Sequence, residues 1–313
     1  MTFADIFSPY SLASFIQECY GKKYLWIDGY SNSNILSSLL SFSDIQTMLD
    51  RNYLSFPSIQ LSKNGEYVEV NKYAHEVEYG KFCLNGVVNG NAVIDEFNSG
   101  STIVINAINR HVESIQGICD IFEEALKCVV YANAYISPPN STGFAPHFDK
   151  HDVVVMQVVG EKDWLIQSSK PASVSPVIDK DVNADCMDSA IKQNLKAGNI
   201  LYLPRGIIHS ASTAQQESIH ISFGVHRRSW FQPLDTALTA CSNESDFREQ
   251  IPLYHNNFSS KNSVGQLKEL QRLASKLIDQ ALLEASICLG NVPKGGVKPF
   301  SRVTKKFNLG SDK

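Results

Sequence analysis

The sequence lacks the features that mark several large classes of protein. Its seven cysteines are scattered, odd in number and never spaced as CxxC, which argues against a disulfide framework and a structural zinc site. No apolar run is long enough to span a bilayer, and we expect no signal peptide. No GxGxxG motif and no P-loop is present, so nothing indicates nucleotide binding. These absences predict a cytoplasmic protein with no membrane segment.

An excess of charge of one sign is also missing. The formal net charge over 313 residues is −4, so no overall basic field favours nucleic acid, and we expect no direct nucleic-acid binding. Hydrophobic residues make up 43% of the chain and charged residues 19%, which predicts a sizeable folded core rather than disorder. A chain of this length can form one large domain, or one domain with an appendage.

Between residues 100 and 226 most of the predicted secondary structure is β. A β-branched strand at the start of this region is followed by an amphipathic helix over residues 110–127. Further strands are predicted over residues 128–137, 153–159, 163–167, 199–203 and 218–226. No helices interleave with them, which favours an antiparallel sandwich or barrel over a βαβ fold. The predicted fold class is therefore mainly β with flanking helices.

The flanking segments carry little candidate chemistry. Residues 1–98 are expected to pack around the core, and their second half is polar and strand-prone, with turn signals at Asn64-Gly65 and Asn89-Gly90. Beyond residue 230 the pattern predicts a long helix with a broad apolar face. That face has two interpretations, internal packing or a dimer interface.

Residues 135–164 carry most of the candidate chemistry, and the centre of this stretch is the pair His147 and Asp149. In a strand, residues two apart point to the same face, so this imidazole and this carboxylate can converge. Adding a second histidine produces the facial triad of non-haem Fe(II) oxygenases. His209, which follows a predicted strand and a Pro-Arg-Gly turn, is our preferred third ligand.

Two other histidines are alternatives for the third position. His151 would need a bend after Asp149, and His220 is expected on a neighbouring strand, in the core or behind the ligands. The apolar run over residues 153–159 predicts a buried strand, which would place the ligands inside a barrel rather than on its rim.

Polar residues near these positions are candidates for ligand contacts. Lys162 lies between two apolar strands. It is either a solvated hairpin lysine or a cation that pairs with a dicarboxylate in a partly desolvated pocket. Asn133 and Tyr135 are two residues apart, so they would share a strand face and could orient a ligand in the cavity.

These residues resemble the JmjC family of Fe(II)- and 2-oxoglutarate-dependent oxygenases. Within it, the resemblance is to the ribosomal oxygenases, which hydroxylate histidine or arginine side chains of ribosomal proteins. It is carried by the segments NAYISPPNSTGFAPHFDKHD, GNILYLPRGIIH and SIHIS, and by Gln157, Gly160, Lys162 and Trp164. The resemblance implies a double-stranded β-helix that uses Fe(II), 2-oxoglutarate as co-substrate, and O2.

The resemblance also implies roles for single residues. The metal triad falls on His147, Asp149 and His209, and the basic residue that binds the distal carboxylate of 2-oxoglutarate falls on Lys162. The position of Tyr135 resembles that of a tyrosine in the substrate pocket.

Three further positions complete the predicted site. Asn133 is assigned to the co-substrate. A small hydroxyl-bearing residue of the family falls on Gly224 in this chain, and the nearby Ser222 is assigned to the substrate instead. The wall of the pocket is therefore expected to differ from the family pattern.

The resemblance implies two domains. Residues 1–230 would form the catalytic domain, with an N-terminal segment over 1–98 and the core over 99–230. Residues 231–313 would form a helical region that makes a homodimer, without a complete winged helix.

The resulting hypothesis is an oxygenase that hydroxylates a protein or peptide side chain, with a ribosomal protein among the candidate substrates, and that releases succinate and CO2. One alternative is the same chemistry on a free amino acid or a biosynthetic peptide. A second is a non-catalytic metal-binding cupin scaffold, which would bind metal without consuming 2-oxoglutarate.

Overall fold

The computed structural model describes residues 2–29, 36–51, 54–167, 187–227, 231–249 and 260–290. The chain divides into two compact units, residues 1–227 and residues 228–313. Across the described ranges, every helix is too short or too polar to cross a lipid bilayer.

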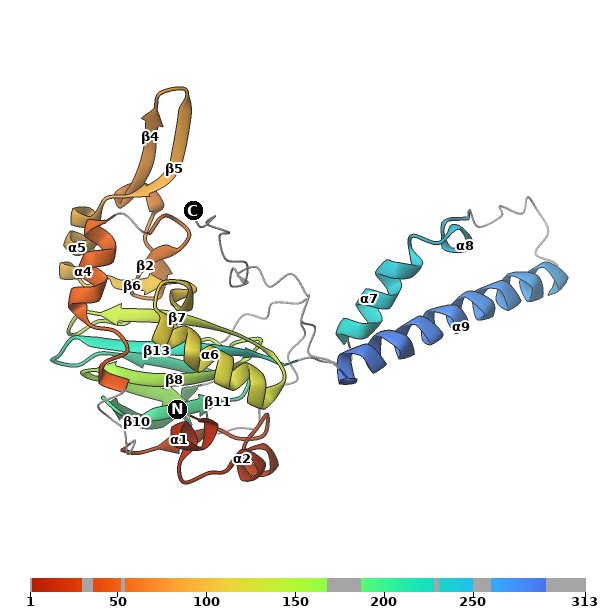
Figure 1. Ribbon diagram of the computed structural model, residues 1–313, viewed down its shortest axis with the longest axis horizontal. Coiled ribbons are helices and arrows are strands. Elements are labelled where there is room, and N and C mark those ends of the chain that lie inside the picture. The colour runs from red at the N-terminus through yellow and green to blue at the C-terminus, as the bar shows by residue number, and fades with distance from the viewer. Residues whose placement is uncertain are drawn as a thin grey trace, which may run out of the picture. The chain divides into compact units, whose positions relative to one another are not determined.

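A large antiparallel sheet is the main element of the first unit (Figure 1). Its eight strands lie in the order β1-β11-β8-β13-β7-β6-β2-β3, so strands far apart in the sequence are neighbours. The strands are β1 (Leu25–Ile27), β2 (Ile59–Lys63), β3 (Glu66–Tyr67), β6 (Thr102–Ile105), β7 (Val129–Ser137), β8 (Asp152–Val159), β11 (Ile200–Leu203) and β13 (Ser218–His226).

A second sheet, in the order β10-β9-β12, faces the large one. Its strands are β9 (Glu161–Ile166), β10 (Ile191–Lys196) and β12 (His209–Ser212). One apolar cluster joins Val155 of β8 and Leu201 of β11 to Trp164 and Ile166 of β9, so the space between the sheets is filled by side chains. The predicted mainly β class is confirmed, and the two facing sheets have the form of a double-stranded β-helix.

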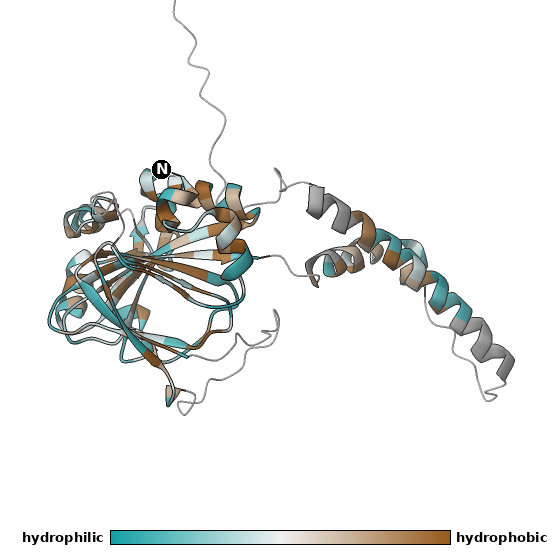
Figure 2. Ribbon diagram, turned by 90° about the horizontal axis from the view of Figure 1, so that it is seen from below, coloured by the Kyte–Doolittle hydropathy of each residue, from teal (hydrophilic) through white to brown (hydrophobic). Residues whose placement is uncertain are grey.

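The other face of the large sheet is covered by helices. There the main hydrophobic core contains Phe122 of a helix and Phe223 of β13, whose rings make an edge contact at 5.5 Å. Hydrophobic residues run along these strands (Figure 2). The covering helices are α1 (Phe3–Phe7), α2 (Leu12–Glu18), α4 (Phe42–Asp50), α5 (Gly90–Asn98) and α6 (Glu113–Leu126).

Strand β8 explains why the sequence contains an uninterrupted apolar run. Val154 and Met156 point into the core beneath the helices, whereas Val153 and Val155 point into the space between the sheets. A strand buried on both faces has no polar positions to alternate with. Strands β10 and β12 were not predicted, because they are short and carry polar residues.

One of the two turn signals before residue 100 is wrong. Asn89-Gly90 is not a turn: the side chain of Asn89 accepts a hydrogen bond from the backbone N–H of Ala92 at 3.2 Å and caps α5. The Asn64-Gly65 turn does join β2 to β3. A separate hairpin contains β4 (Ala74–Tyr79) and β5 (Phe82–Val88), and short 3-10 turns cover Val70–Lys72 and Ile108–Arg110.

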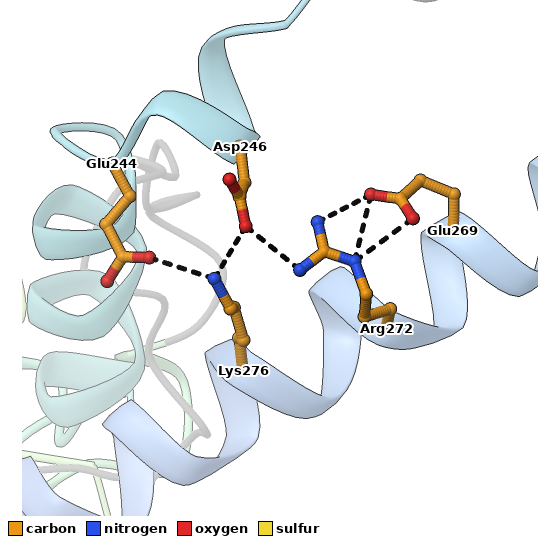
Figure 3. A network of polar contacts seen from close by, with 5 residues as sticks. All are labelled: Glu244, Asp246, Glu269, Arg272 and Lys276. Carbon is orange, nitrogen blue, oxygen red and sulfur yellow. Dashed lines mark hydrogen bonds and ion pairs between the residues drawn. The ribbon is translucent and has the colours of Figure 1, made fainter.

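The second unit contains α7 (Phe231–Cys241), α8 (Ser245–Arg248) and α9 (Ser260–Gly290). Polar contacts tie α8 to α9 (Figure 3). The carboxylate of Asp246 accepts hydrogen bonds from Arg272 at 2.9 Å and Lys276 at 2.6 Å, and these bonds lower the pKa of Asp246 to about 2. Arg272 also pairs with Glu269, and Lys276 with Glu244. Residues 291–313, which are rich in lysine and arginine, lie outside the described residues.

Candidate metal centre

His147 and Asp149 lie in the loop between β7 and β8, not in a strand as predicted. An isolated bridge pairs His147 with His209 at the start of β12. The backbone N–H of His147 donates to the carbonyl of His209 at 3.0 Å, and the reverse bond measures 2.8 Å. The histidines therefore converge because two distant segments are hydrogen-bonded together, and not because of the pleat of one strand.

The three predicted ligands lie together. One ligand atom from each of His147, Asp149 and His209 can be chosen so that all lie within 4.8 Å of one another. The Nδ1 atom of His147 donates to the carbonyl of Ala145 at 2.9 Å, and the Nδ1 atom of His209 donates to the carbonyl of Ile207 at 3.0 Å. Each Nε2 atom then carries a lone pair, which is the usual second-shell arrangement of a metal-bound histidine.

The donor set suits Fe(II), because two imidazoles and one carboxylate form a facial triad and leave coordination positions free. Burial lowers the pKa of His209 and outweighs the opposite effect of the Asp149 charge, so the ring stays neutral and able to bind a metal. His209 is buried, whereas His147 and Asp149 are half-buried. The ligands therefore lie at the mouth of the barrel rather than wholly inside it.

Lys162 is only 3% exposed, which rules out the solvated hairpin lysine. Its Nζ donates to the hydroxyl of Ser137 at 2.7 Å and lies 3.4 Å from Nδ1 of His220. Burial alone lowers the pKa of Lys162 to about 7, and no acidic side chain among the described residues offsets it. A buried ammonium whose described partners are neutral is suited to an anionic ligand.

His220 lies next to this lysine and is linked to His209 through the ring of Trp164. Its ring stacks on Tyr135 at 4.7 Å and meets Trp164 edge-on at 5.5 Å, and Trp164 in turn stacks on His209 at 5.8 Å. Burial, with the nearby charge of Lys162, holds the pKa of His220 well below its ordinary value. The indole N–H of Trp164 is buried and has no acceptor among the described residues. The ammonium of Lys162 and the indole N–H of Trp164 are therefore donors suited to a dicarboxylate co-substrate.

Asn133, Tyr135 and Ser222 share the inner face of the large sheet with His220. In the register of β13 on β7, Ser222 lies opposite Asn133 and His220 opposite Tyr135. Asn133 Oδ1 accepts a hydrogen bond from the backbone N–H of Ala107 at 3.0 Å. Burial, with the charge of Asp149, raises the pKa of Tyr135, so its hydroxyl stays protonated and able to donate.

Gly224 makes room for a histidine. A Cβ atom at this position would lie 2.8 Å from Nε2 of His151. His151 stacks on His226 at 4.4 Å, and His226 contacts Tyr131 at 5.1 Å. His151 therefore fills the space next to Gly224 and is not part of the converging triad. Sequence reasoning missed His226, although it lies two residues from Gly224 and so on the same strand face.

The rim of the site contains a second feature that the sequence did not predict. Phe144 packs against His147 at 5.9 Å and against Tyr67 at 5.5 Å, and Tyr67 is 62% exposed. The β2–β3 turn is held here because the backbone N–H of Gly65 donates to the carbonyl of Gly143 at 3.1 Å. The only hint of this rim in the sequence is Phe144, an aromatic residue three positions before His147 in the same loop.

Comparison with known proteins finds a family model that matches the region containing these residues. Residues 105–232 match the model of the JmjC domain. The chain therefore carries a JmjC domain, and the predicted resemblance to this family is confirmed.

The similar sequences are proteins called bifunctional lysine-specific demethylase and histidyl-hydroxylase NO66. The protein from Drosophila grimshawi is 29% identical over 79% of this chain and 34% of the relative. The one from Drosophila yakuba is 32% identical over 63% of this chain and 28% of the relative. The chain thus spans about a third of the curated relatives it matches.

The fold is similar to that of YcfD, a ribosomal oxygenase from Escherichia coli. Its structure with cobalt and succinic acid superposes with a TM-score of 0.55 at 16% identity, covering 87% of this chain and 68% of YcfD. Its structure with cobalt and 2-oxoglutarate superposes with a TM-score of 0.54 at 15% identity, covering 91% of this chain and 71% of YcfD. At this identity the likeness concerns the fold.

We predict that the triad binds a divalent metal. Replacing His147 by Ala removes one of three ligands, so Co(II) affinity measured by calorimetry should fall by at least about a hundredfold, because a loss in the first shell should exceed the 10- to 100-fold typical of the second shell. His75→Ala, which changes an exposed histidine on β4, is the matched control and should bind as the wild type does. Equal Co(II) affinity in His147→Ala and wild type would contradict the assignment.

Proposed function

We propose that this chain is an Fe(II)- and 2-oxoglutarate-dependent hydroxylase of a protein or peptide side chain. The observation that carries the proposal is the convergence of His147, Asp149 and His209 in the same barrel as the buried ammonium of Lys162. The JmjC domain match supports it, as do the histidyl-hydroxylase activity named for the relatives and the 2-oxoglutarate bound by YcfD.

The triad would hold Fe(II) through Nε2 of His147, Nε2 of His209 and a carboxylate oxygen of Asp149. Bound there, the metal and 2-oxoglutarate would supply an oxidation in which O2 converts 2-oxoglutarate to succinate and CO2 and a substrate C–H group to C–OH. The protein supplies binding, orientation and exclusion of water.

Lys162 would bind the distal carboxylate of 2-oxoglutarate. The hydroxyl of Ser137 holds its Nζ, and the neutral ring of His220 can accept a hydrogen bond from it without adding charge. The apolar cluster around Trp164 excludes water, which strengthens an ion pair in the pocket. Asn133 would help to orient the co-substrate, while Tyr135 and Ser222 would contact the substrate.

A scaffold that only binds metal gives Lys162 no role. Burying an ammonium without an anion destabilises a fold. A buried lysine without an anionic partner among the described residues is therefore better explained by binding of an anionic ligand. Consumption of 2-oxoglutarate by wild type but not by Asp149→Ala separates the two classes of protein.

The depressed pKa of Lys162 predicts a pH dependence of co-substrate binding. The ammonium form binds the carboxylate, so affinity should be constant below pH about 7, and it should fall up to about tenfold per pH unit above it, because a proton must then be taken up. Lys162→Arg stays charged throughout and should remove this dependence.

The measurement is the dissociation constant of 2-oxoglutarate for Co(II)-loaded protein, by calorimetry between pH about 6 and 9. Lys162→Met should weaken binding by about 10- to 100-fold, which corresponds to a lost charged hydrogen bond of about 1.5–3 kcal/mol. A profile of the same shape in wild type and Lys162→Arg would exclude Lys162 as the titrating group.

The substrate we propose is a side chain of a ribosomal protein. Support comes from the ribosomal oxygenase YcfD and from Tyr67, an exposed aromatic residue packed on Phe144 at the rim of the site, which a polypeptide substrate would contact. Ribosomal proteins of the source organism, incubated with the chain, Fe(II), ascorbate and 2-oxoglutarate, should gain one oxygen on a single protein by intact mass spectrometry.

His147→Ala is the control for this experiment and should produce no gain in mass. If 2-oxoglutarate is consumed but no ribosomal protein gains oxygen, the substrate is another polypeptide, a free amino acid or a biosynthetic peptide. Turnover stimulated by free amino acids would favour a free amino acid or a biosynthetic peptide as the substrate.

We also propose that residues 1–230 form the catalytic domain, with an N-terminal segment over 1–98 and the core over 99–230, and that the helices after residue 230 form a homodimer. Several large apolar side chains of α7 and α9 remain exposed, among them Leu270 at 64% and Ile278 at 58%. Exposed apolar surface of this extent is typical of an interface.

Sedimentation velocity tests the dimer. The wild type should sediment as a dimer, and Leu270→Glu combined with Ile278→Glu should sediment as a monomer, because two charges would be buried without partners. Gln271→Glu adds a charge at an exposed polar position of the same helix and should leave the dimer intact. A monomeric wild type would sink the proposal.

A further inference from the structure

Asp152, the first residue of β8, is a carboxylate that the proposed chemistry does not use. It is 0% exposed and lies three residues after the ligand Asp149. Its Oδ2 accepts a hydrogen bond from the hydroxyl of Tyr202 at 2.6 Å and lies 2.9 Å from Nε of Arg227. Its Oδ1 accepts a hydrogen bond from the backbone N–H of Arg205 at 2.9 Å. Both oxygens are therefore engaged by the protein, and neither is free to bind a metal.

Arg205 belongs to the turn that leads to the third metal ligand. The backbone N–H of Ile207 donates to the carbonyl of Pro204 at 3.2 Å, and Gly206 has φ +84°, so the turn is of the kind that needs glycine at its third position. Gly206 itself donates to the carbonyl of Asp149 at 3.0 Å. Two successive N–H groups of the turn are thus bound by the segment that carries Asp149.

The remaining partners of Asp152 hold the carboxylate in place. The hydroxyl of Tyr202 accepts a hydrogen bond from the backbone N–H of Gly21 at 2.7 Å, and the guanidinium of Arg227 lies over the ring of Tyr20 at 5.2 Å. A buried charge is tolerated only where such partners satisfy it, so the position of this carboxylate is strongly determined.

We propose that Asp152 is a positioning residue for the metal centre. Its carboxylate docks the Pro204–Ile207 turn onto the 149–152 segment and so fixes where His209 lies relative to His147 and Asp149. It acts through the backbone of Arg205 and touches no ligand atom. This inference rests on the proposed metal centre but on no particular substrate.

Asp152→Ala removes the acceptor for the N–H of Arg205. Its Co(II) dissociation constant should rise by about 10- to 100-fold, the range typical for residues behind the metal ligands. Asp152→Asn keeps an oxygen for that N–H while giving up the charge, so it should recover most of the Co(II) affinity even though the fold is less stable.

A control separates positioning from stability. Phe122→Leu perturbs the core on the other face of the sheet and does not touch Asp152 or its partners. It should lower the melting temperature and leave the Co(II) affinity within about twofold of the wild type. If Asp152→Ala does not fold, Asp152→Glu, which shifts the carboxylate by one methylene, should also weaken Co(II) binding.

Amide hydrogen exchange of the metal-free protein supplies a readout independent of any ligand. Exchange at residues 205–209 should be faster in Asp152→Ala than in wild type, unchanged in Phe122→Leu and largely restored in Asp152→Asn. Faster exchange together with weaker Co(II) binding supports the proposal.

Equal Co(II) affinity in wild type and Asp152→Ala overturns the proposal and leaves the metal centre intact. An equal loss in Phe122→Leu also overturns it, because the effect would then follow stability alone. A wild type that binds no Co(II) is a distinct result, which overturns the metal centre and this inference together.

Discussion

Two backbone hydrogen bonds between His147 and His209 are the constraint on which the site depends. They join the loop before β8 to the start of β12, more than sixty positions apart in the numbering, and they bring two imidazoles and the Asp149 carboxylate to one place. Neither segment is a regular partner of the other, since the bridge is isolated from the sheets. The donor atoms are aimed by backbone carbonyls that bind each Nδ1. Such hydrogen bonds to the second nitrogen fix the tautomer and the ring orientation of a metal-binding histidine.

Burial of charge is the second theme of the molecule. Asp152 and Lys162 are both removed from water, but they differ in how they are satisfied. Asp152 has a hydroxyl, a backbone N–H and a guanidinium as partners, so it can stabilise a fixed arrangement. The partners of Lys162 among the described residues are neutral, so binding of an anion would compensate its buried charge. The buried charge of Asp152 thus has a structural role, whereas that of Lys162 is suited to binding an anionic ligand.

Much of the fold could be predicted from the sequence because hydrophobic pattern and period carry it. The apolar run of β8, the amphipathic α6 and the absence of interleaved helices pointed to a mainly β barrel with flanking helices. β10 and β12 escaped prediction because short polar strands are defined by their neighbours and not by their own residues. Asn89-Gly90 was wrong as a turn because an asparagine that starts a turn and one that caps a helix look alike in sequence.

The sequence by itself determined the chemistry that is available: two histidines and an aspartate with metal-binding character, a lysine between apolar strands and a family resemblance. Ligand identity follows from side-chain type, which is local. The tertiary structure alone decided that Lys162 is buried with neutral described partners, that Gly224 yields its space to His151, and that Asp152 holds the turn before His209. Each of these depends on contacts between segments distant in the chain, and no local pattern encodes them.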